Sequence, residues 1–267
     1  MARHEITLKR AVYEIEGMTE AAVRRDIQYA TSETGPLTMD VYRPADAGDS
    51  PLPAIILAGG FPDAGVSLTL GCTSKQMEMV ISWAQLIAAT GICAVAYTKQ
   101  NPSRDLVRLV HYLRADGTKL GIVGDRVGLW AASGNVPVAL SLLMRGSAAT
   151  VACAALLYGF MLDAPGHTAV ADAAAAWKFA NPAAGKSVAD LRPGVPLLVV
   201  RAGADQFAGL NDTIDRFVVS ALAHDVPLTL VNHAGAPHAF DLMDASEASR
   251  RVIRQVLAFL REHLRVS

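Results

Sequence analysis

The sequence has few cysteines, few charged residues and no excess of charge of one sign. Its three cysteines, Cys72, Cys93 and Cys153, are an odd number without CxxC spacing, which argues against a disulfide framework and against a zinc site. Lysine and arginine number 24 against 25 acidic residues, for a net charge of −1. A nucleic-acid-binding surface requires clustered basic residues. We therefore expect no metal and no nucleic-acid partner.

The sequence also lacks a long hydrophobic run. Residues 1–10 are polar and have no apolar core of the kind found in a signal peptide. The longest apolar run, 148–162, is interrupted by Thr150 and Gly159, and it is shorter than the ~20 residues that cross a bilayer. We expect no membrane span and a cytoplasmic protein.

Apolar residues are abundant, at 52% of the 267 positions. A chain of this length forms a full core without disulfides or metals, because about 70–75% of its unfolded surface becomes buried. The sequence contains neither an internal repeat nor a low-complexity linker. One domain spanning residues 1–267 is the simplest interpretation.

Short apolar runs alternate with stretches of helical period. This pattern is typical of an α/β protein with a mostly parallel central sheet and helices on both faces. Strands are expected at 37–44, as an edge hairpin strand, and at 53–60, 92–97, 127–133, 149–160, 196–203 and 227–233. Helices are expected at about 75–90, 106–114, 136–144, 211–223 and 246–264.

Residues 163–194 interrupt this alternation. They contain an alanine-rich helical stretch at 170–180, followed by Pro182, Gly185 and Pro193, and no strand pattern. The segment is interpreted as an insertion over the edge of the sheet, either a small lid or a surface excursion. We favour a lid because ligands of α/β sheets bind at the carboxyl ends of the strands, where such insertions lie.

Ser133 is the candidate nucleophile. It lies between the strand ending in Leu129-Trp130 and the helix that follows, in the string Ala131-Ala132-Ser133-Gly134-Asn135. A serine on a tight strand-to-helix turn projects its hydroxyl clear of the sheet, usually within G-x-S-x-G. Here alanine and asparagine replace the two glycines. A helix-capping serine is the alternative interpretation.

Asp205 and His238 are the candidate acid and base. Asp205 follows the strand PLLVVRAG, and His238 lies in the loop after PLTLVNH. The order serine, acid, histidine is that of α/β-hydrolases, and all three residues follow predicted parallel strands. A serine needs a base to take its proton, and the base needs a carboxylate to orient it.

Several other residues compete for these two roles. A histidine within a strand is more often structural, and Asp212 and Asp215 are expected on a solvated helix face, so these fit less well. Asp241 follows His238 too closely along the chain. The competing residues are His233, Asp212, Asp215 and Asp241, together with His4, His111, His167, His224 and His263.

From about Asp26 onward, the chain resembles the α/β-hydrolase superfamily, nearest to its dienelactone-hydrolase-like and carboxylesterase branches. The strings LTMDVYRP, LAGGFPDAG, GDRVGLWAASG and VRAGAD followed by APHAFD carry the resemblance, in the order that the superfamily has them. Dienelactone hydrolases use a cysteine nucleophile, so Ser133 favours an esterase.

The resemblance also implies an oxyanion hole. The loop after PAIIL would supply one donor, the backbone N–H of Phe61 or, alternatively, of Gly60. The N–H of Gly134 would be the second donor. Gly59 stands where the superfamily commonly has a histidine. Losing one such donor costs on the order of 10²–10³ in rate.

These residues together predict a serine hydrolase that cleaves a small-molecule carboxylic ester without a cofactor. Lactone opening, C–C bond hydrolysis and acyl transfer would use the same three residues. A small-molecule binding protein without turnover is the alternative from another class. Phe61, Trp177 and Phe179 are candidate pocket residues, with Met161 and Leu162 as further candidates.

Overall fold

A computed structural model describes residues 2–144 and 151–264. Within them, one sheet of eight strands runs through the molecule in the order β1-β2-β4-β3-β5-β6-β7-β8. The strands are β1 (Ala22–Ser32), β2 (Gly35–Arg43), β3 (Leu52–Leu57), β4 (Cys93–Tyr97), β5 (Ile122–Ala132), β6 (Val151–Leu157), β7 (Leu197–Ala202) and β8 (Leu228–His233).

The sheet is mostly parallel. The six strands from β4 to β8 in the spatial order pair in parallel, while β2 is antiparallel to both β1 and β4. The carboxyl ends of the parallel strands therefore meet at one edge of the sheet. Loops leaving this edge are close in space although they are far apart in sequence.

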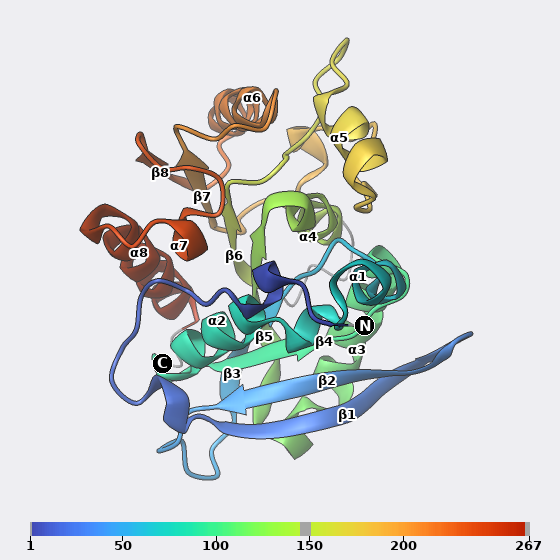
Figure 1. The fold of residues 1–267 in the computed structure, drawn as a ribbon, viewed down its shortest axis with the longest axis vertical. Helices are drawn as coiled ribbons and strands as arrows, with labels where there is room; N and C mark the ends of the chain where they lie inside the picture. Colours follow the sequence, from blue (N-terminus) through green and yellow to red (C-terminus); the bar gives the residue numbers. More distant parts are fainter. Residues whose placement is uncertain (1, 145–150, 265–267) are drawn as a thin grey trace.

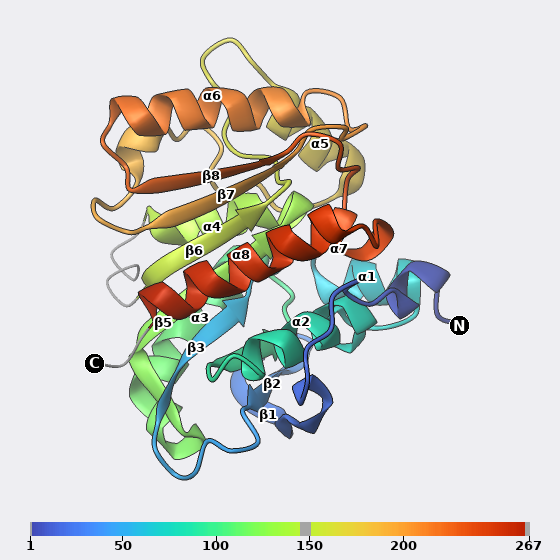
Figure 2. The same ribbon diagram turned by 90° about the vertical axis from the view of Figure 1, so that its left-hand side faces the viewer.

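Helices cover both faces (Figure 1). Buried apolar residues of α3 (Pro102–Asp116), α4 (Val136–Leu143), α5 (Ala169–Trp177) and α6 (Leu210–Ala223) belong to one core cluster. Those of α2 (Glu78–Ala88), α7 (Phe240–Met243) and α8 (Glu247–His263) belong to the other. Figure 2 shows α2 and α8 lying across the same face of the sheet. The short helix α1 (Asp63–Leu70) follows β3. The predicted fold class is confirmed.

Local sequence explains where the long helices begin. The Ser246 side chain accepts a hydrogen bond from the Ser249 N–H and caps α8, whose buried face includes Val252, Val256 and Leu260. Asn101 caps α3 in the same way, and Pro102 occupies the first turn, where its missing N–H costs nothing. Both helices thus combine a polar cap with an apolar stripe.

The N-terminal part of the sheet differs from the prediction. Residues 37–44 were expected to form the edge strand, but β1 is the edge and β2 lies inside it. The β1 sequence is rich in charge, and its register shifts between Arg24 and Ile27 and again between Gln28 and Ala30, so it lacks a regular alternation. The helix expected at 75–90 begins only at Glu78, because Met77 is extended. Positions 149 and 150 of the expected strand 149–160 lie outside the described residues.

Among residues 2–144 and 151–264, no helix combines the length and apolarity that a membrane span needs.

Gly124 tests the packing of α3 against β5. A methyl group at Gly124 would lie 1.8 Å from the Leu113 carbonyl oxygen, which belongs to rigid backbone. We expect Gly124→Ala to lower the free energy of unfolding by roughly 1–3 kcal/mol, measured by urea denaturation. Gly65→Ala is the control. It lies within α1 with nothing near the added methyl, so alanine should stabilise by about 0.5–1 kcal/mol. Equal effects of the two substitutions would contradict this packing.

Candidate active site

Ser133 occupies a strained turn between β5 and α4. Its φ of 56° lies in the left-handed region, which a residue with a side chain rarely adopts. The turn is tightly packed. A methyl group on Gly134 would lie 2.7 Å from the Phe179 ring, and one on Gly159 would lie 2.1 Å from Val136. Small neighbours therefore permit the turn that presents the Ser133 hydroxyl at the edge of the sheet.

His238 lies between Ser133 and Asp205. Its Nε2 is 2.9 Å from Ser133 Oγ, and its Nδ1 is 2.6 Å from Asp205 Oδ2. The Asp205 side chain is fully buried, and its other oxygen accepts a hydrogen bond of 2.9 Å from the Phe207 N–H. The three side chains that the sequence proposed as nucleophile, base and acid thus form one continuous hydrogen-bonded chain.

The loops that carry Asp205 and His238 are joined through their backbones. Gly203 N–H donates to the His233 carbonyl, and Ala204 N–H donates to the Ala236 carbonyl; both N···O distances are 2.9 Å. A methyl group on Gly203 would lie 2.2 Å from the Ala234 carbonyl oxygen, so only glycine allows this approach. The close contact fixes the carboxylate relative to the imidazole.

A buried polar cluster supports the far side of the His238 ring. The Tyr158 ring packs edge-on against it, with the centroids 5.0 Å apart. The Tyr158 hydroxyl donates to Asp241 Oδ1 over 2.5 Å, and Trp83 Nε1 donates to Asp241 Oδ2 over 2.7 Å. Burial raises the pKa of the Asp241 carboxyl above its usual value. Asp241 therefore anchors the aromatic side chain against which His238 rests.

The competing residues lie in other surroundings. His233 Nε2 is 3.0 Å from Ser249 Oγ, Asp215 pairs with Arg201, and His167 Nε2 is 2.7 Å from Arg216. These partners indicate structural or surface roles for the three residues, as the sequence suggested for His233 and Asp215.

Asn135 links the Ser133 turn to the loop after β3. Its backbone has ordinary right-handed helical angles, φ −85° and ψ −19°, so it does not distort the turn. Its side-chain Oδ1 accepts a hydrogen bond of 2.7 Å from the Gly60 N–H. In the described part of the chain, the Phe61 N–H makes no hydrogen bond. Of the two alternatives for the first oxyanion donor, Gly60 is thus occupied and Phe61 is available.

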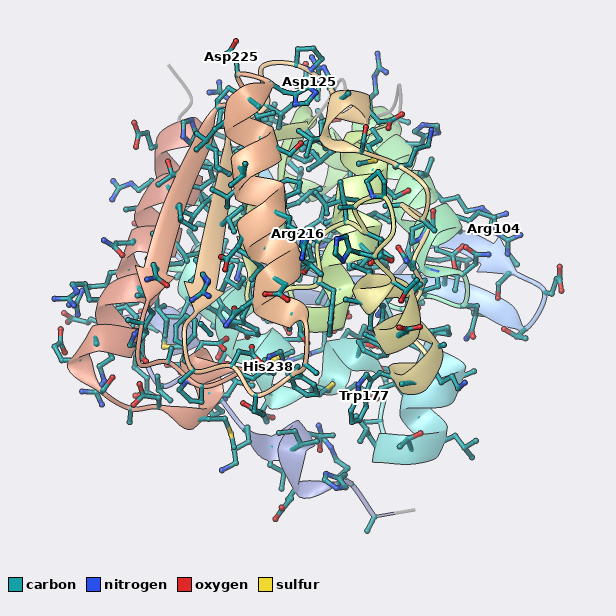
Figure 3. All side chains as sticks on the ribbon, turned by 90° about the horizontal axis from the view of Figure 1, so that it is seen from above. Arg104, Asp125, Trp177, Arg216, Asp225 and His238 are labelled. Carbon is teal, nitrogen blue, oxygen red and sulfur yellow. The ribbon has the colours of Figure 1, made fainter. Side chains whose placement is uncertain are left out.

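A cavity of about 130 Å³ opens at the Ser133 hydroxyl, and we name it the Ser133 cavity. Its lining is almost entirely aromatic: Phe61, Ser133, Gly134, Phe160, Trp177, Phe179 and Phe207. Trp177 and Phe179 come from the segment 163–194. In Figure 3, Trp177 and His238 lie at one end of the molecule, and Asp125 and Asp225 lie at the opposite end.

Sequence reasoning identified three of these aromatic residues and missed two. Phe207 packs against His238 at 4.5 Å between ring centroids, and Phe160 stacks on Phe179 at 5.6 Å. Both residues lie just beyond the carboxyl end of a parallel strand, β7 for Phe207 and β6 for Phe160, and this position in the sequence could have identified them. Met161 and Leu162 do not line the cavity, because Met161 is fully buried in the core and Leu162 faces a different hollow.

Within residues 2–144 and 151–264, no cluster of histidine, cysteine or acidic side chains could hold a metal ion. The three cysteines are buried and unpaired with one another.

Neither a scan against family models nor a search of curated proteins finds a match. Solved structures do match across nearly the whole chain. A thermostable esterase from Pseudomonas putida shares 17% identity with a TM-score of 0.70, covering 98% of this chain and 87% of that one. The esterase Est2 from Thermogutta terrifontis shares 17% with a TM-score of 0.69, covering 97% of each chain. A bacterial heroin esterase shares 16% with a TM-score of 0.69, covering 96% and 88%.

The chain has the α/β-hydrolase fold. In the topology of this fold, the Ser133 turn, the Asp205 loop and the His238 loop follow β5, β7 and β8 at the carboxyl edge of the sheet. The α/β-hydrolase resemblance seen in the sequence is confirmed at the level of the fold. The nearer resemblance to dienelactone hydrolases stays a prediction.

Asp241 gives the α/β-hydrolase core a pH-dependent stability. Its pKa in the folded protein is raised above the ordinary value of 3.8, so the unfolded chain loses this proton at a lower pH than the folded protein does. The free energy of unfolding therefore decreases as the pH rises above about 4. Asp241→Asn cannot ionise. We expect the difference in unfolding free energy, wild type minus variant, to decrease from pH 4 upward in urea titrations.

Asp244→Asn is the matched control for this titration. Hydrogen bonds from Ser249 and Ser246 lower the pKa of Asp244 in the folded protein. Its contribution to the free energy of unfolding is therefore present above about pH 4 and is lost as the pH falls through this lowered pKa. The pH dependence of this variant should therefore have the opposite sign. A constant difference for Asp241→Asn between pH 4 and 8 would show that the carboxyl does not titrate in this window.

Proposed function

We propose that this chain is a serine hydrolase that cleaves small carboxylic esters through an acyl-enzyme, with Ser133 as nucleophile, His238 as general base and Asp205 as its carboxylate partner. The observation that carries the proposal is the continuous hydrogen-bonded chain from Ser133 Oγ through His238 to Asp205 Oδ2, at 2.9 and 2.6 Å. A serine hydroxyl is a weak nucleophile unless a base takes its proton, and these contacts provide that base.

The reaction proceeds in two halves. His238 Nε2 takes the proton as Ser133 Oγ attacks the ester carbonyl, and Asp205 stabilises the imidazolium that forms. His238 then gives the proton to the leaving alcohol, which departs and leaves an acyl-serine. Water then attacks the acyl carbon while His238 takes its proton, and His238 gives that proton to Ser133 Oγ as the acyl–oxygen bond breaks and the acid leaves. No step needs a metal or an organic cofactor.

The N–H groups of Phe61 and Gly134 stabilise the tetrahedral oxyanion. Asn135 supports this arrangement, because its Oδ1 binds the Gly60 N–H and so holds the loop that carries Phe61. A methyl group on Gly60 would lie 2.3 Å from the Gly134 carbonyl oxygen, so the two donor loops are in close contact. Preorganised donors are worth more than mobile ones because they need no reorganisation during the reaction.

The substrate is an ester with a small, flat or short acyl or alcohol group. The Ser133 cavity is about 130 Å³ and is lined by aromatic rings, which suit a single ring or a short chain. The segment 163–194 acts as a small lid within one hydrolase domain, since it contributes Phe179 and Trp177, a residue that is 58% exposed, to this cavity.

The solved esterases of this fold favour ester hydrolysis over the other reactions that the same three residues could perform. Lactone opening, C–C bond hydrolysis and acyl transfer are the alternative activities. A binding protein without turnover would have no need for the strained Ser133 backbone, whose φ of 56° is retained only where the surrounding structure enforces it.

Hydrolysis of a short aryl ester such as p-nitrophenyl acetate tests the nucleophile. Wild-type protein should release p-nitrophenol, and Ser133→Ala should lower kcat roughly 10⁴-fold or more while circular dichroism and the melting temperature show the variant to be folded. Full activity in Ser133→Ala would refute the assignment of Ser133.

The role of Asn135 is tested by restoring the common motif. Asn135→Gly recreates the second glycine of G-x-S-x-G but removes the acceptor for Gly60. We expect kcat to fall about tenfold or more, with KM nearly unchanged, because the effect is on the oxyanion and not on substrate binding. Ala131→Gly restores the first glycine without removing a hydrogen bond and should change kcat less than about threefold. A gain of activity in Asn135→Gly would contradict the positioning role.

A further inference from the structure

A second cavity lies behind the loop that carries Phe61, and we name it the Lys99 cavity. It has a volume of about 190 Å³ and lies between α1, the start of α2 and the carboxyl ends of β3 and β4. Its lining is largely apolar and includes Val66, Leu70, Met77, Met79 and Trp130. Apolar cavities of about 150 Å³ accept a benzene ring, so this one can hold a single aromatic ring or a short alkyl chain.

Lys99 brings an amino group to this apolar wall, where burial lowers its pKa and the Asp63 and Asp105 carboxylates act to raise it. The residue is only 2% exposed and lines the cavity. In the described part of the chain, its ammonium donates no hydrogen bond, and the carboxylate that pairs with it, Asp63 Oδ2, lies 3.8 Å away. Three N–H donors in an apolar interior normally find acceptors, because an unsatisfied buried charge is costly.

Asp63 is committed to other donors. Its Oδ1 accepts a hydrogen bond of 2.6 Å from the Ser74 N–H, and its Oδ2 accepts one of 2.7 Å from the Lys99 N–H. The carboxylate therefore holds the backbone of two loops and balances the Lys99 charge only at a distance. The Lys99 ammonium also lies over the Tyr97 ring, 5.3 Å from its centroid, a contact that accepts no N–H···O hydrogen bond.

The surrounding sequence makes room for this lysine. A methyl group at Gly59 would lie 2.1 Å from Lys99 Cε, so the Lys99 side chain fills the space beside this glycine. A methionine of similar length at position 99 would fill the same space without burying a charge. The proposed hydrolysis gives the Lys99 side chain no role.

We propose that the Lys99 cavity binds a small apolar carboxylate, with its acid group on the Lys99 ammonium and its ring or chain against Val66, Leu70 and Met77. A carboxylate supplies the acceptors that the ammonium lacks, and charge-assisted hydrogen bonds of this kind are the strong ones. The apolar remainder of the ligand replaces empty or poorly hydrated space against the apolar wall.

This site is separate from the Ser133 cavity. Ser133 and His238 are absent from the lining of the Lys99 cavity, whereas Phe61 lines both cavities. Binding in the Lys99 cavity therefore does not depend on turnover at Ser133, and it can be measured in Ser133→Ala. Failure of the hydrolysis test would leave this binding unaffected.

Methyl NMR with benzoate and toluene as probes tests the proposal on the full chain. The eight methionine methyl groups are labelled with ¹³C and the indole N–H groups of the three tryptophans with ¹⁵N, and the Trp177 signal reports on the Ser133 cavity. Benzoate should shift the methyl signals of Met77 and Met79 in wild type and in Ser133→Ala, and it should bind about tenfold or more tightly than toluene. Shifts confined to the Trp177 indole, equal affinities for the two probes, or no binding of benzoate would each overturn it.

Lys99→Met is the deciding variant. Benzoate affinity should fall about tenfold or more while toluene still binds. Lys119→Met removes an exposed lysine whose side chain is 77% exposed, and it should leave both affinities unchanged. If Lys99→Met does not fold, Val66→Phe serves instead, because the larger ring fills the cavity and should abolish benzoate binding. Undiminished benzoate binding in whichever of the two variants folds would overturn the proposal.

Discussion

The hydrogen-bonded position of the His238 ring is the constraint on which the site depends. The ring touches Ser133 on one side and Asp205 on the other, residues that are 105 and 33 positions away in the sequence. Three separate loops must therefore be held to within a few tenths of an ångström. The parallel sheet provides the coarse placement, since β5, β7 and β8 end at the same edge. The glycine contact at Gly203 and the Tyr158–Asp241 cluster provide the fine placement.

Much of this arrangement could be predicted from sequence. The order serine, acid, histidine, each after a parallel strand, reflects chain topology, which apolar periodicity reveals. The supporting contacts could not be predicted, because they depend on side-chain geometry. Asn135 is an example: the sequence shows that it replaces a glycine of the common motif, but only the structure shows that its amide oxygen binds the Gly60 N–H. The charged and bulged strand β1 gave no alternating pattern, and it was missed for that physical reason.

The departures from the common motif form a consistent set. Asparagine at position 135 replaces a glycine and secures the loop after β3 from one side. Glycine at position 59 replaces the common histidine and admits the Lys99 side chain from the other side. Phe61 directly follows the two glycines that make these contacts and borders both cavities. The loop that would carry the oxyanion donor is thus held by contacts particular to this chain.

The most direct test of the account is whether the Ser133 hydroxyl is activated by His238. A fluorophosphonate reacts with activated serines, and intact-mass spectrometry with peptide mapping locates the adduct. The account predicts one adduct, at Ser133, forming roughly 10² times more slowly or worse in His238→Ala. Folded protein that stays unlabelled, or labelling of Ser133 at the same rate in His238→Ala, would contradict it.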